Sequence, residues 1–92
     1  MAKKLSLSGA NAVRTILKNK EEFHTDLLSK EEDGGRTTYT YDFFYGDTNG
    51  TFTVVTENDA VVIAVLKPAM GRVISLMNDT NIRKLAEYVL EH

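Results

Sequence analysis

Aromatic and polar side chains alternate strictly in the middle of the chain, over the run TTYTYDFFY. An alternation of period two places its four rings on one face of a β-strand. The four residues are Tyr39, Tyr41, Phe43 and Tyr45. Two further strand-like runs, GTFTVV and AVVIAVLK, follow in the sequence. The pattern therefore predicts three antiparallel strands, near 37–45, 51–56 and 60–67.

The turn-rich pieces between these runs predict tight hairpins. Asn49-Gly50 follows the first run and Glu57-Asn58-Asp59 the second, and such residues accept the positive φ of two-residue turns. The third run contains VVIAVL, which is apolar on both faces and typical of a central strand. We expect a helix to cover it on one side, and protein or a partner on the other. Pro68 ends this strand, and RVISLM predicts a further short strand.

The segment before the aromatic strand fits two interpretations. Phe23, Leu27 and Leu28 continue a helical spacing, whereas FHTDLLSKEE can pair with the aromatic run across Asp33-Gly34-Gly35. Glycine adopts positive φ without steric strain, so the Asp-Gly and Gly-Gly dipeptides favour the hairpin. Whether residues 23–31 form a helix or a strand decides the size of the sheet.

Helical spacing appears at both ends of the chain. Val13, Ile16 and Leu17 predict a helix near 8–20, with Ser6 or Ser8 as its N-cap. Asp79 or Thr80 can cap a final helix whose apolar positions are Ile82, Leu85, Ala86 and Val89. The predicted fold is a single α+β domain with an N-terminal helix, a four- or five-stranded antiparallel meander sheet and a C-terminal helix. We expect both helices on one face of the sheet.

Length and composition agree with one domain, since the 92 residues are 42% hydrophobic and 26% charged. We assign this domain to residues 1–89. Leu90-Glu91-His92 matches the start of a common expression-tag remnant, so residues 90–92 carry no functional argument. His24 is then the single histidine to consider.

Charge and cysteine content limit the classes of partner that we expect for this protein. The formal net charge is −2 and the basic residues are scattered, which disfavours nucleic acid. There is no cysteine, and no run resembles a signal peptide or the ~20 apolar residues of a membrane span. We expect a small cytoplasmic protein of bacterial or phage type that has no membrane partner.

Candidate chemistry is sparse. A zinc site needs three or more donors, and His24 alone cannot supply them. No serine sits in a strained nucleophile elbow, and Asp42 points away from the four rings by strict alternation. The sequence therefore predicts no catalytic residues, no metal and no cofactor.

Binding is the function that remains. If the rings form the core, the opposite face of the sheet is open to a protein partner or a second copy. The interface that we predict comprises Phe44, Phe52 and Val55. The alternative is a single-stranded nucleic acid or a nucleotide, stacked on Tyr39, Tyr41 and Tyr45 and held at its phosphates by Arg36 and Arg72.

Overall fold

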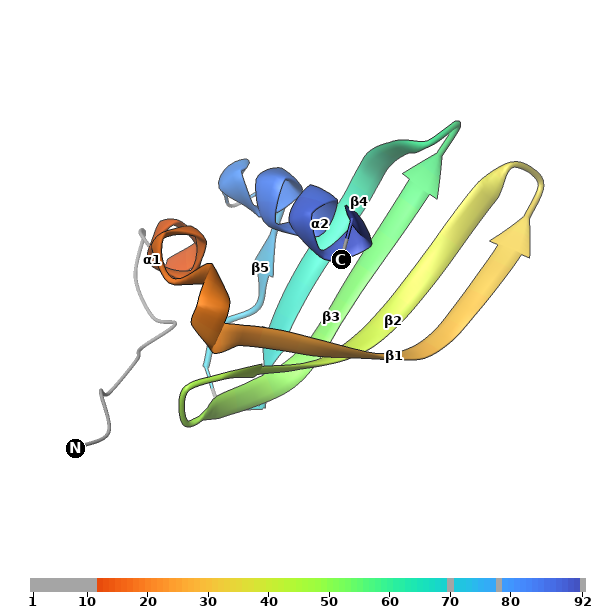
Figure 1. Cartoon of the computed structure of the whole chain (residues 1–92). Helices are drawn as coiled ribbons and strands as arrows, with labels where there is room; N and C mark the ends of the chain where they lie inside the picture. The colour runs from red at the N-terminus through yellow and green to blue at the C-terminus, as the bar shows by residue number, and fades with distance from the viewer. Residues whose placement is uncertain (1–11, 70, 78, 92) are drawn as a thin grey trace.

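A computed structural model of the chain describes residues 12–69, 71–77 and 79–91. The elements follow in the order α1 (Ala12–Lys18), a 3₁₀ turn (Lys20–Glu22), β1 (Phe23–Asp33), β2 (Arg36–Tyr45), β3 (Thr48–Glu57), β4 (Ala60–Pro68), β5 (Ile74–Ser75) and α2 (Asn81–Glu91). The five strands form one antiparallel meander sheet in sequence order. The predicted α+β fold is confirmed, with helices at both ends of a five-stranded sheet (Figure 1).

Residues 23–33 form a strand, as the glycine pair indicated. Asp33 pairs with Arg36 across Gly34 and Gly35, whose φ values are 60° and 83°. Asn58 and Asp59 have φ values of 54° and 67°, and they close the β3–β4 hairpin in the same way. Both loops have the left-handed backbone that matches the twist of the flanking strands.

The β2–β3 turn does not lie where the sequence predicted it. Tyr45 pairs with Thr48, so the turn is Gly46-Asp47, and Asn49 and Gly50 are residues of β3. Gly46 supplies the positive φ, at 59°. Gly50 has a different role, because a Cβ there would collide with the carbonyl oxygen of Lys67 and with the Phe43 ring. Glycine is required at position 50 for close approach of β4 to β3.

The two helices lie on the same face of the sheet, as expected (Figure 1). The described part of α1 ends at Lys18, where the Asn19 side-chain amide donates to the carbonyl oxygen of Thr15 at 2.9 Å. Residues 8–11 of the predicted helix, and the serines proposed as its cap, lie outside the described residues. At the start of α2, the backbone N–H of Asn81 donates to Oδ1 of Asp79 at 2.9 Å, in agreement with the predicted cap.

The core lies between the helices and the face of the sheet that they cover. Phe23 of β1 stacks on Phe43 of β2, with ring centroids 5.7 Å apart, and it contacts Phe52 of β3 edge-on at 6.2 Å. The helices contribute Val13, Ile16, Ile82, Leu85 and Val89 to the same cluster. This helix-covered side is called the inner face below, and the opposite side the outer face.

Candidate functional site

The predicted interface residues lie on different faces of the sheet. Phe44 and Val55 are on the outer face, where Phe44 is 41% exposed and Val55 only 7%. Phe52 pairs with Tyr41 on the inner face and is fully buried in the core. Phe52 therefore cannot contact a partner of this folded structure, and the expectation that it shares a surface with Phe44 is corrected by the register.

Phe44 and Val55 are also far apart on the outer face. Val55 pairs with Thr38 of β2, which is six residues from Phe44 along the same strand. At about 3.4 Å per residue the two side chains are roughly 20 Å apart. Val55 instead lies beside Ile63, its cross-strand partner in β4.

The three tyrosines of the alternative site are placed mainly in the core. Tyr45 is fully buried, and its hydroxyl donates to the carbonyl oxygen of Thr15 at 3.4 Å. Tyr41 is buried as well, and Tyr39 is half-buried, with its ring stacked on Tyr41 at 6.3 Å. Burial raises the pKa of Tyr41, and the neighbouring Tyr39 contributes in the same direction. Of the three rings, only that of Tyr39 has surface available for stacking.

The two arginines of the alternative site lie at opposite ends of the sheet. Arg36 begins β2, and its guanidinium forms a 2.8 Å ion pair with Glu57 at the end of β3. Arg72 is exposed and follows Pro68, at the other end of β4. The structure does not bring Arg36 and Arg72 together as a phosphate clamp.

A different surface combines exposure with apolar character, at the edge of the sheet where β4 meets β5. β5 pairs with β4 only at Val65 and Leu66, so no strand among the described residues pairs with the outward edge of residues 60–64. Beside this free edge lies a groove of about 380 Å³, lined by residues 62–65 and 75–77. Val62 is 39% exposed, Ile63 40% and Met77 96%. We call the apolar side chains of this region the β4–β5 edge surface; they are Val62, Ile63, Val65, Leu76 and Met77.

The opposite edge of the sheet, β1, has a different character. It carries ionisable side chains along most of its length, namely His24, Asp26, Lys30, Glu31, Glu32 and Asp33. The register with β2 also shifts between Leu27 and Ser29, which leaves Leu28 as a bulge. Charges and bulges are devices that prevent an edge from pairing with another chain. β4 has a bulge at Val62 as well, but residues 60–66 contain no charge.

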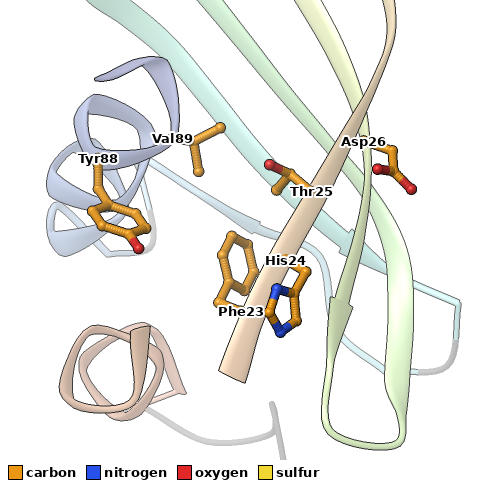
Figure 2. Close-up of a pocket in the computed structure, with 6 residues that line it drawn as sticks. All are labelled: Phe23, His24, Thr25, Asp26, Tyr88 and Val89. Carbon is orange, nitrogen blue, oxygen red and sulfur yellow. The ribbon is translucent and has the colours of Figure 1, made fainter. Parts of the chain in front are cut away.

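A second groove, of about 350 Å³, lies between β1 and α2. Figure 2 shows Phe23 and Thr25 on the side of β1 that faces Tyr88 and Val89 of α2. His24 and Asp26 point away from Tyr88, on the other side of the strand (Figure 2). The two side chains of β1 that could act as acid or base therefore do not face the Tyr88 hydroxyl across the groove.

The described residues also form no candidate metal site. Within residues 12–69, 71–77 and 79–91, no three histidine or carboxylate side chains are placed to hold a metal ion. His24 is exposed on the edge strand β1. In the part of the chain that the structure describes, neither helix is long and apolar enough to cross a membrane.

Comparison with known proteins gives no further guide. No protein-family model matches the chain, and neither a curated protein nor a solved structure matches it. Function is therefore inferred from the surfaces described above.

Sequence reasoning missed most of the β4–β5 edge surface. The apolar run VVIAVL was the available signal, since it predicted that one side of this strand would need cover from protein or a partner. The sequence did not show that β5 would be only two residues long, and this length determines that Val62 and Ile63 lie beside a free edge. Met77 was predicted as the last residue of the strand RVISLM, and the structure places it after the end of β5.

Proposed function

We propose that this protein is a small non-enzymatic binding module that docks a protein partner on the β4–β5 edge surface. The observation that carries the proposal is an apolar groove beside a strand edge that carries no charge and is paired by no other described residue. Exposed apolar side chains that gather around a groove mark binding surfaces more often than scattered ones do. An open strand edge adds unpaired backbone donors and acceptors to the same place.

The partner that fits this surface presents an extended apolar segment. Such a segment can lie along residues 60–64 and place its side chains against Ile63, Leu76 and Met77 in the groove. Methionine suits this use, because its unbranched side chain adapts to different partners. Desolvation of these side chains supplies the affinity, and the strand edge orients the bound chain.

A titration followed by amide NMR tests the proposal. The probe is a short peptide of alternating threonine and valine with a lysine at each end, which is extended and carries no recognition sequence. We expect chemical-shift changes at residues 60–66 and 75–77. The changes should be lost in Val62→Lys, because a lysine at an edge strand opposes strand addition. They should persist in Leu28→Lys, a matched change at an exposed residue of the β1 edge.

Two results would contradict the proposal. Shifts confined to residues 23–26 and 88–89 would move the site to the groove of Figure 2. No shifts at the highest soluble peptide concentration would show that the β4–β5 edge surface does not accept an extended chain.

A further inference from the structure

The two ends of the β4–β5 edge surface carry charges of opposite sign. At the start of β4, Asp59 lies beside Glu87 of α2, since both line a hollow of about 450 Å³ with Val61. At the other end, Lys67 closes the β4 run and Arg72 follows it. All four side chains are exposed, and none of them forms an ion pair in the described part of the chain.

The end of α2 lies near the start of β4, because Glu87, Leu90 and Glu91 line the same hollow as Asp59. Arg83 precedes Glu87 by one turn on the same stripe of the helix. The edge of the molecule is therefore acidic at one end, apolar in the middle and basic at the other end.

A pattern of this kind is complementary to itself when two copies meet in opposite directions. We infer that the partner of the β4–β5 edge surface is a second copy of this chain, packed antiparallel about a two-fold axis near Val62. This inference rests on the proposed function and names its partner. Each acidic end then faces the basic end of the other copy, whereas a parallel arrangement would bring like charges together.

The middle of the surface is compatible with self-contact. A two-fold axis brings the residues nearest to it against their own copies, here Val62 and Ile63. Because residues 60–66 carry no charge, this contact buries no unpaired ion. The exposed Met77 of each copy lies beside the groove and can cover the apolar side chains of the other.

The antiparallel pairing also limits the assembly to two copies. Once both β4–β5 edge surfaces are covered, β1 is the only long strand edge left among the described residues of each copy. β1 carries ionisable side chains that discourage pairing, which residues 60–66 of β4 lack, so the dimer has no further edge to extend. We expect a dimer and no fibre or higher oligomer.

Sedimentation velocity of the full chain over a wide concentration range tests the inference. We expect the mass to rise from 10.3 kDa at high dilution to twice that value at high concentration. Val62→Lys should raise the dissociation constant at least about tenfold, because it places a charge at the contact. The matched variant Leu28→Lys should leave the dissociation constant unchanged. Both positions are exposed, so neither change should unfold the monomer.

Charge reversal tests the antiparallel orientation. Lys67→Glu should raise the dissociation constant about two- to fivefold, as should Glu87→Lys, since each places like charges at both meeting points. The double variant should bind about as tightly as the original chain, because the two ends are complementary again. Additive weakening in the double variant would overturn the antiparallel arrangement.

A single cysteine tests the position of the axis. The chain has no cysteine, so Val62→Cys introduces one thiol per copy. Under mild oxidation we expect a disulfide-linked dimer, because only a residue close to a two-fold axis meets its own copy within disulfide reach. Leu28→Cys should remain monomeric under the same conditions.

The possible failures are distinguishable. A chain that stays monomeric while the threonine–valine peptide still shifts residues 60–66 would overturn the second copy as partner and leave the proposed function standing. A dimer that is insensitive to Val62→Lys would overturn the location of the contact. Loss of both self-association and peptide binding would overturn the inference and the proposed function together.

Discussion

Val55 and Ile63 are cross-strand partners on the outer face of the sheet, yet Val55 is 7% exposed and Ile63 is 40% exposed. Val55 has a strand on each side, because Thr38 of β2 pairs with it as well. Within the described part of the chain, Ile63 has a strand on one side only, since the pairing of β5 with β4 reaches no farther than Val65. The exposure of Ile63 is therefore a consequence of the short β5.

Truncation of these two residues should separate stability from binding. Val55→Ala removes buried methyl groups and should lower the free energy of unfolding by about 2 kcal/mol. Ile63→Ala removes exposed surface and should lower it by less than about 1 kcal/mol, while weakening any contact at the β4–β5 edge surface. Urea denaturation at low protein concentration measures both. An equal loss in the two variants would show that Ile63 is part of the monomer core.

Gly50→Ala should be one of the most damaging small changes in the chain. The added Cβ meets the carbonyl oxygen of Lys67 and the Cα of Pro68, which are backbone atoms and cannot move aside. We expect a loss of about 3 kcal/mol in the free energy of unfolding.

Gly34→Ala is the control for this change. Its Cβ would meet no atom within 4 Å, so only the positive φ of 60° opposes the substitution. We expect a loss of about 1 to 2 kcal/mol. A Gly50→Ala variant as stable as the original chain in urea would contradict the close approach of β4 to β3.

Tyr41→Ala distinguishes a core role from a nucleobase-stacking role. Tyr41 is buried, and its ring centroid lies 6.4 Å from that of Phe52. The change should lower the free energy of unfolding by about 3 kcal/mol. If Tyr41 stacked nucleobases instead, the variant would keep its stability and lose about 1 to 3 kcal/mol of binding to a single-stranded oligonucleotide. Thermal unfolding and an oligonucleotide titration of the same variant decide between them.

Stability should fall at alkaline pH. Burial raises the pKa of Tyr41 above its ordinary value of 10. Burial is also the main reason that the pKa of Tyr45 is raised, with the charges of Glu22 and Glu21 adding to it and a hydrogen bond with Asn19 opposing it. The folded chain therefore holds these protons more tightly than the unfolded chain does. Their contribution is complete below about pH 10 and is lost as the pH rises through the raised pKa values.

Tyrosine-to-phenylalanine variants test this pH dependence. We expect urea midpoints of the original chain to decline above about pH 10, and the decline to be smaller in Tyr41→Phe and Tyr45→Phe, which cannot ionise. Tyr45→Phe should also lose about 1 kcal/mol at neutral pH, since it removes the hydroxyl that donates to Thr15. Declines of the same size in all three proteins would exclude these tyrosines as the cause.

The order of elements was predictable because local signals agreed with the tertiary structure. The alternation of the aromatic strand and the two-residue turns at Gly34-Gly35 and Asn58-Asp59 set the registers of the β1–β2 and β3–β4 hairpins. Asn49-Gly50 failed as a turn signal for a physical reason. Gly46 provided the positive φ earlier in the chain, and Gly50 was needed where two backbones approach closely.

The binding surface was less predictable because it depends on where β5 ends and on which residues of β4 it leaves uncovered. Burial of Phe52 follows from its pairing with Tyr41 on the inner face, and a two-residue turn at Asn49-Gly50 would have placed it on that face as well. Exposure of Val62 and Ile63 depends on the end of β5 after Ser75, and no local pattern specifies that end. The sequence thus predicted that the run VVIAVL needs to be covered on both faces. It did not predict which of its residues remain exposed.

Amide NMR spectra of the full chain over a dilution series test the central claim most directly. If the β4–β5 edge surface is the docking site and a second copy its partner, shifts that change with concentration will be confined to residues 57–67 and 72–77 and to the α2 stripe at Arg83 and Glu87. Changes centred on the outer-face residue Phe44 or on the groove between β1 and α2 would contradict the account, as would a spectrum that is unchanged at every concentration.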